Sequence, residues 1–236
     1  MGNFSKKIDK FIEIFIEYEG YVKVLEGLKN TLIIAVLGLI IGIVIGTVIA
    51  IVRVLPKYKL LPRILNGMCS FYVALFRGTP IVVQLLVFYY VLFPLMGMKI
   101  TGVDVSILVF GLNSAAYISE IMRSGIMSVD NGQMEAGRAV GLSFSTSMIK
   151  IVIPQAIKNI LPTLGNEFIA LVKETSVVSF VGATDLYLAF NVIGSNSYEF
   201  MVPYLVMALI YIVLVLIISL GIKIMERSLR KSDRRN

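Results

Sequence analysis

The sequence contains no histidine and no tryptophan, and it has a single cysteine. The lack of histidine excludes histidine-dependent triads, histidine acid–base chemistry and most zinc sites. One cysteine cannot form an internal disulfide, so Cys69, which lies in an apolar stretch, is expected to be a buried and unreactive thiol. No G-x-x-x-x-G-K-[ST] sequence occurs, so the chain lacks that phosphate-cradling loop for ATP. If nucleotide hydrolysis drives this protein, another polypeptide must bind the nucleotide.

Charged residues are also scarce. They make up 16% of the 236 residues, against 57% hydrophobic residues, whereas soluble domains average about 25% charged and about 45–50% apolar residues. Long apolar runs between the charges therefore predict an all-α integral membrane protein. The net charge of +7 comes from basic residues in short stretches between these runs. That distribution is typical of membrane topology, so nucleic acid is not expected as a partner.

Five apolar segments are long enough to cross a bilayer as helices, which requires about 20 residues each. The expected spans are residues 30–54, 64–97, 104–127, 161–184 and 200–224. With five spans, the basic groups after the first, third and fifth spans all lie on the cytoplasmic side. We therefore predict about five transmembrane helices, with the N-terminus outside and the C-terminus inside. The segment 185–199 is then an external loop.

The remaining segments complete the expected domain organisation. Residues 1–27 predict an amphipathic N-terminal surface helix, because apolar side chains recur there at helical spacing. Residues 28–225 form the transmembrane domain, and residues 226–236 form a basic cytoplasmic tail. Gly38, Gly42 and Gly46 lie four residues apart in the first span and predict close packing with another helix, of this chain or of a second one.

The loop at residues 130–158, between the third and fourth spans, carries helix signals. Asp130 and Ser143 are suitable N-caps, and Gly141 suits the left-handed position that ends a helix. Pro154 is expected to break the second helix. The pattern predicts two short cytoplasmic helices joined by a glycine turn, and by itself it also fits a merely compact loop.

The same loop resembles the signature loop of binding-protein-dependent ABC transporter permeases, whose pattern is E-A-A-x3-G-x9-I-x-L-P. Gly137 stands at the second alanine of the pattern, and Ile153 stands at its leucine. The resemblance implies a coupling helix that docks into a socket on an ATPase subunit and transmits its closure. The residues to which it assigns ATPase coupling are Glu135, Ala136, Gly137, Gly141, Ile151, Ile153 and Pro154.

Four further stretches narrow the resemblance to the polar amino acid branch of these permeases, which takes up histidine, glutamate, glutamine, arginine and opines. They are residues 76–80, 115–126, 153–156 and 161–169. The resemblance implies a multi-pass protein of the bacterial cytoplasmic membrane that works with a second permease subunit as a homodimer, two ATPases and an extracellular or periplasmic amino-acid-binding protein. It implies no catalytic residue, metal or cofactor in this chain, because ATP and Mg²⁺ would be held by the partner ATPase.

Polar and ionisable side chains within the spans are candidates for the substrate pathway, because charges in a membrane are costly and usually face a cavity or a partner. The candidates are Arg77, Asn113, Ser114, Glu167, Lys173 and Glu174. Glu167 and Glu174 share one helical face and would suit the cation of a basic, arginine-like amino acid. If Lys173 or Arg77 neutralises them permanently, a neutral substrate such as glutamine fits instead. Glu120 and Arg123, three residues apart, are expected to pair with each other.

Two other functions compete with an ATP-driven importer. One is a self-sufficient secondary transporter or channel, which the five spans and the lack of an internal repeat disfavour. The other is a membrane anchor for a cytoplasmic partner, which would need the loop but not the buried charges. Neither alternative would be coupled to ATP.

Overall fold

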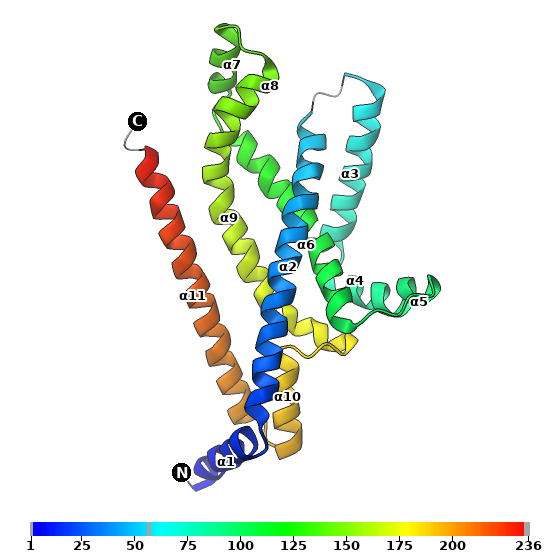
Figure 1. Ribbon diagram of the computed structural model, residues 1–236, viewed down its shortest axis with the longest axis vertical. Coiled ribbons are helices and arrows are strands. Elements are labelled where there is room, and N and C mark those ends of the chain that lie inside the picture. The colour runs from blue at the N-terminus through cyan, green and yellow to red at the C-terminus, as the bar shows by residue number, and fades with distance from the viewer. Residues whose placement is uncertain (1, 56–57, 234–236) are drawn as a thin grey trace.

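The computed structural model describes residues 2–55 and 58–233, which form helices and turns and contain no strand (Figure 1). Three helices are long and apolar enough to cross a membrane: α2 (Gly20–Val54), α6 (Gly102–Met127) and α11 (Met201–Asp233). Two bent pairs raise the number to five if each pair is one span. The expected all-α membrane fold is therefore confirmed, while the side of the membrane on which each terminus lies stays a prediction.

The helices α2 and α6 make the most extensive contact between helices in the molecule. The glycines Gly38, Gly42 and Gly46 of α2 all face α6. A Cβ atom at Gly42 would lie 2.8 Å from the Ser114 hydroxyl oxygen, and one at Gly46 would lie 2.9 Å from the Ala115 carbonyl oxygen. The close packing predicted for these glycines therefore occurs within this chain, because only glycine allows the two backbones to approach so closely.

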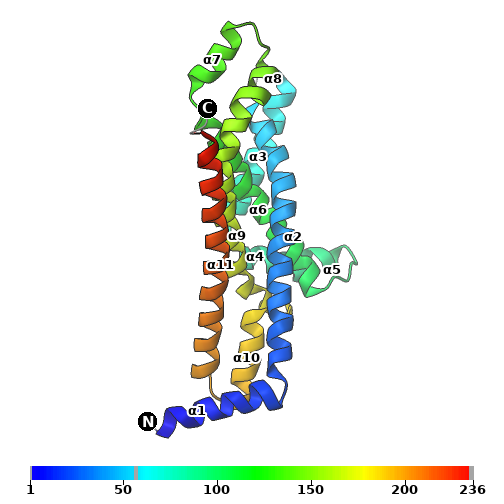
Figure 2. The same cartoon turned by 60° about the vertical axis from the view of Figure 1, so that its left-hand side comes forward.

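The second span is broken. It begins with α3 (Leu60–Gly78), turns by 106°, and continues through α4 (Ile81–Val87), a π-helical turn (Phe88–Leu92) and α5 (Phe93–Leu95). The backbone is extended at Thr79 and Pro80, because proline has no N–H to donate and disfavours a helical conformation in the residue before it. Figure 2 shows that the segment from α4 to α5 runs away from the bundle instead of continuing along it.

The fourth span differs from the expected residues 161–184. A continuous helical run of α8 (Phe144–Ser147), a π-helical turn (Met148–Val152) and α9 (Ile153–Glu174) leads directly from the central loop into the span. The prediction that Pro154 breaks the helix is wrong. Pro154 lies in the first turn of α9, where the preceding π-helical turn accommodates a residue that has no N–H.

The prediction of an external loop at residues 185–199 is also wrong in part, because this segment contains the helix α10 (Leu186–Ser197). A 3-10 helix (Thr175–Val181) connects α9 to α10, with a bend of 55° between the two halves of the span. Asp185 caps α10 by accepting hydrogen bonds from the backbone N–H groups of Tyr187, at 3.0 Å, and Leu188, at 2.9 Å. The helix was not predicted, although Asp185 precedes it as a suitable N-cap residue.

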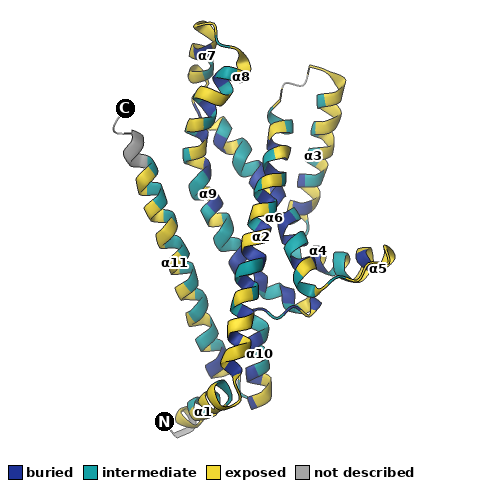
Figure 3. Cartoon of the chain, in the orientation of Figure 1, coloured by how far each residue is buried: buried dark blue, intermediate teal, exposed yellow. Residues whose placement is uncertain are grey.

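The two ends of the bundle carry different elements. At one end, α1 (Gly2–Ile12) lies across the bundle (Figure 2), where the Lys7 ammonium lies 2.9 Å from a Glu199 carboxylate oxygen. The surface segment is shorter than the expected residues 1–27, since α2 already begins at Gly20. At the other end lie the end of α2, the start of α3 and the loop containing α7 (Asn131–Ala139) and α8 (Figure 1). Burial is concentrated on α6 and on the faces packed against it, whereas α11 exposes many apolar side chains, as a lipid-facing helix does (Figure 3).

Candidate functional site

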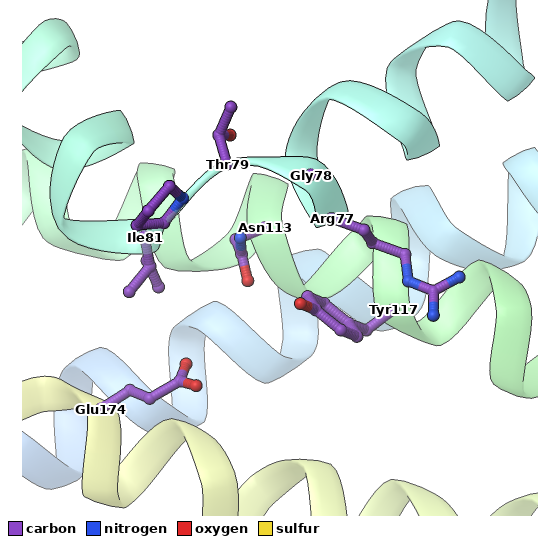
Figure 4. Close-up of a pocket in the computed structure, with 8 residues that line it drawn as sticks. Arg77, Gly78, Thr79, Ile81, Asn113, Tyr117 and Glu174 are labelled. Atoms are coloured by element: carbon purple, nitrogen blue, oxygen red, sulfur yellow. The ribbon is translucent and has the colours of Figure 1, made fainter.

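An open polar cavity of about 350 Å³ lies where the second span is broken. Its walls come from α3 and α4 at the break, from α6, and from the end of α9 (Figure 4). The lining residues are Arg77, Gly78, Thr79, Pro80, Ile81, Asn113, Tyr117 and Glu174. Three of the predicted pathway residues, Arg77, Asn113 and Glu174, are therefore brought together although they lie far apart in the sequence.

The cationic side of the cavity is formed by Arg77. Its guanidinium carbon lies 5.3 Å from the centre of the Tyr117 ring, an arrangement in which the ring stabilises the positive charge. Among the described residues, Arg77 makes no ion pair with a carboxylate within 4.0 Å. Its charge is therefore available at the cavity. Tyr117 was missed by the sequence analysis, although it lies four residues after Asn113 and so on the same face of α6.

The two predicted acidic residues have different surroundings. Glu174 is exposed and its carboxylate points into the cavity (Figure 4). Glu167 does not line the cavity, and it accepts a hydrogen bond of 3.0 Å from the Ser114 hydroxyl, which is fully buried. No lysine or arginine nitrogen of the described residues lies within 4.0 Å of either carboxylate. Lys173 is exposed and does not line the cavity.

Asn113 joins the cavity to the broken span. Its side-chain nitrogen donates to the Gln84 amide oxygen, at 3.0 Å, and to the Phe76 carbonyl oxygen, at 3.3 Å. Its own amide oxygen points toward the cavity (Figure 4). Gln84 in turn donates to the carbonyl oxygens of Phe76 and Thr79, which the break leaves without helical partners. Gln84 was also missed, and the signal that would have found it is an uncharged polar residue within an apolar run.

The central loop contains α7, the first of the two predicted short helices, whereas α8 is the start of the helical run that continues into α9. Asp130 accepts a hydrogen bond from the backbone N–H of Gly132, and Ser143 accepts one from that of Thr146. Between the helices, Gly141 has a φ of +90°, and the Leu142 N–H donates to the Gly137 carbonyl oxygen. This is the left-handed glycine termination that the sequence indicated.

The inner and outer faces of α7 differ. Gly137 is buried, and a Cβ atom there would lie 2.7 Å from the Ser147 hydroxyl oxygen and 2.9 Å from the Ile151 Cδ1. Glycine at the second alanine of the motif therefore lets α7 lie close to the helical run that leads into α9. Glu135 and Ala136 are exposed on the outer face. Of the other motif residues, Ile151 and Ile153 are half-buried, and Pro154 is exposed.

Another polar cluster, formed by Arg53, Glu120 and Arg123, lies near the end of the bundle that carries the central loop. Arg123 lies 2.8 Å from a carboxylate oxygen of Glu120, which confirms the predicted pair. The other carboxylate oxygen accepts a hydrogen bond from Arg53 of α2. Arg53 was not predicted as a partner, because no local spacing relates it to Glu120.

The sequence is similar to those of known membrane components of transport systems. Residues 38–231 match the family described as the binding-protein-dependent transport system inner membrane component. The chain is 40% identical over 166 residues to the arginine transport system permease protein ArtQ of Bacillus subtilis (strain 168), covering 70% of this chain and 76% of that protein. It is also 40% identical over 167 residues to a putative glutamine transport system permease protein GlnP of Rickettsia bellii (strain RML369-C), covering 71% and 77%.

Solved structures agree with this comparison. A crystal structure of an amino acid ABC transporter with histidines superposes with a TM-score of 0.83 at 37% sequence identity, covering 91% of this chain and 96% of that one. An inward-facing structure of the methionine ABC transporter MetNI has the same fold, with a TM-score of 0.73 at 20% identity and coverage of 87% and 95%.

Proposed function

The chain belongs to the family of binding-protein-dependent transport system inner membrane components, and we propose that it forms the translocation pathway of an ATP-driven amino acid importer. It is thus a permease subunit of the bacterial inner membrane and not an enzyme. Membership of the family implies a separate ATPase and a substrate-binding protein as partners. ATP and Mg²⁺ are proposed to bind in the ATPase.

The observation that supports coupling is the continuity between the central loop and the cavity. The helical run that packs against α7 continues without a break into α9, which has 22 residues and so spans about 33 Å before it ends at Glu174. We propose that the ATPase binds the exposed outer face of α7 at Glu135 and Ala136. Gly137, Gly141, Ile151, Ile153 and Pro154 then hold α7 in a fixed relation to α9. A displacement of the loop is transmitted to the cavity along one continuous helical run.

The proposed substrate is a polar amino acid, with a basic side chain preferred. An amino acid zwitterion offers a carboxylate and an ammonium group, which Arg77 and Glu174 complement. Glu167, hydrogen-bonded to Ser114 behind this cavity, adds a second negative charge, which favours a substrate with an additional cation such as arginine. The exposed Lys173 next to Glu174 supports the competing proposal of a neutral substrate such as glutamine. Relatives named for arginine and for glutamine are equally similar, so the preference depends on these charges.

The proposed assembly contains a second copy of this chain and two ATPases. The segment from α4 to α5 supports it, because it projects from the bundle and exposes apolar side chains, among them Tyr90 at 59% and Leu95 at 79% exposure. Such surface requires either lipid or another protein as a partner. Mass measurement of the purified complex separates a homodimer from a heterodimer of permeases.

Uptake into proteoliposomes tests the proposed function. The permease is purified with its ATPase, reconstituted with the binding protein outside and ATP inside, and given labelled arginine or glutamine. We expect uptake that depends on ATP and the binding protein, with arginine taken up faster. ATP-independent uptake would indicate a secondary transporter, and no uptake despite ATPase co-purification would indicate a membrane anchor.

A further inference from the structure

A second polar pocket, of about 360 Å³, opens between α2, α3 and α6 near the end of the bundle that carries the central loop. Its lining residues are Arg53, Val54, Asn66, Ser70, Arg123 and Met127. It shares no residue with the polar cavity at the broken span. The volume lies in the range of about 300–1,000 Å³ that is usual for small-molecule sites.

The pocket has an unbalanced positive charge. Arg53 and Arg123 both interact with the carboxylate of Glu120, so two guanidinium groups face one carboxylate. The side chains of these three residues are between 16% and 34% exposed, which leaves them only partly hydrated. Of the five N–H groups of Arg53, only one bonds to a described residue. The cluster therefore retains one net positive charge and donors for an anion.

The facing wall of the pocket adds neutral donors. Asn66 and Ser70 lie four residues apart on one face of α3, and their side chains make no hydrogen bond with any residue in the described part of the chain. Arg63, three residues before Asn66, is exposed on the same face. Arginine, amide and hydroxyl donors that converge in this way match the oxygens of a phosphate group.

We propose that this pocket binds the phosphate group of an anionic phospholipid in the leaflet at that end of the bundle. A lipid fits better than free phosphate, because Met127, which lines the pocket, and Leu55, next to the lining residue Val54, expose apolar surface there, at 68% and 46%. Basic pockets between transmembrane helices are typical sites for acidic headgroups. The bound lipid would hold α3 against α2 and α6, and this role is independent of the amino acid that is transported.

Native mass spectrometry of the permease–ATPase complex tests the proposal, with phosphatidylglycerol and phosphatidylcholine supplied in equal amounts. We expect preferential retention of phosphatidylglycerol. Asn66→Asp places a negative charge in the pocket without changing any residue of the Glu120 ion pairs. It should reduce the retention of phosphatidylglycerol about fivefold, because one charge close to a lipid headgroup changes binding by about that factor. Ser70→Asp should do the same, and it provides a second test if Asn66→Asp does not assemble.

The matched control is Asn196→Asp, which makes the same change at an exposed position of α10, at the other end of the bundle. It should leave retention unchanged. Equal retention of the two lipids by the unmodified complex, or equal effects of Asn66→Asp and Asn196→Asp, would overturn the proposal. Displacement of phosphatidylglycerol by excess inorganic phosphate would also overturn it, because the site would then be one for free phosphate.

Discussion

Gly137 and Ser147 are in direct contact in the central loop, where a Cβ atom on Gly137 would lie 2.7 Å from the Ser147 hydroxyl oxygen. That hydroxyl is buried and has no hydrogen-bond partner among the described residues. The contact is thus a steric one that fixes the distance between α7 and the helical run leading to α9. Disrupting this contact should change the coupling of ATP hydrolysis to transport while leaving the transmembrane helices folded.

Gly137→Ala should therefore push α7 outward and destabilise the loop by about 1–3 kcal/mol, as other overpacked sites do. The expected result is a lower ratio of amino acid transported to ATP hydrolysed in proteoliposomes. Ser147→Ala alone should have little effect, because no hydrogen bond is lost. Combined with Gly137→Ala it should restore part of the ratio. A double variant no better than Gly137→Ala would show that the Ser147 contact does not limit the position of α7.

Glu135→Lys should weaken ATPase binding without lowering the melting temperature of the permease, since Glu135 is exposed. Co-purification of the ATPase measures this directly. Glu13→Lys, the same charge reversal at an exposed residue near α1, is the matched control. Normal co-purification and full transport by Glu135→Lys would contradict the docking surface proposed on α7.

Glu174→Gln keeps the shape of a cavity side chain and removes its charge. If the substrate is basic, arginine uptake should fall about tenfold or more, the usual effect of losing a hydrogen bond to a charged group, and glutamine uptake should fall less. Glu167→Gln should also reduce arginine uptake more than glutamine uptake, but by a smaller factor, because Glu167 lies behind the cavity. Equal losses for both substrates would mean that these carboxylates are structural.

The docking of α1 should depend on pH through Glu199. The Lys7 ammonium, together with the backbone N–H of Met201, lowers the pKa of the Glu199 carboxyl below its usual value. A lowered pKa in the folded state means that the ion pair stabilises docking at neutral pH and that this contribution disappears as the pH falls through the carboxyl range. Protease cleavage within α1 should therefore accelerate on acidification, whereas Glu199→Gln should cleave at one rate throughout. Identical pH profiles for the two proteins would exclude this role.

The orientation of the chain can be tested with single cysteines in a Cys69→Ser background. A membrane-impermeant thiol reagent added to intact cells should label cysteine substituted for Lys99 or Tyr198. It should not label cysteine substituted for Arg138. Tyr198 suits the test because it is 92% exposed. Labelling at position 138 from outside would reverse the predicted topology.

The end of α7 with its glycine turn in the central loop, and the membrane fold, were predictable because their signals are local. Asp130, Gly141 and Ser143 act through caps and a positive φ angle, and each requires only its neighbours in the chain. The separation of Glu167 from Glu174 was not predictable. Seven residues place both on one face of a helix, but only the packing of α6 decides that Ser114 meets the first and the cavity meets the second. The partnership of Arg53 with Glu120 likewise depends on how two distant segments pack.

The break in the second span has a consequence for how a substrate enters and leaves. One side chain, Gln84, bonds to carbonyl oxygens on the α3 side and at Thr79, and it also receives the Asn113 amide from α6. These hydrogen bonds hold the bend between α3 and α4 in one conformation. Straightening the bend would leave buried amide and carbonyl groups unpaired, at a cost of about 1–3 kcal/mol each. Opening of the pathway is therefore expected to involve movement of α9 and Glu174 relative to this bend, while the bend itself keeps its conformation.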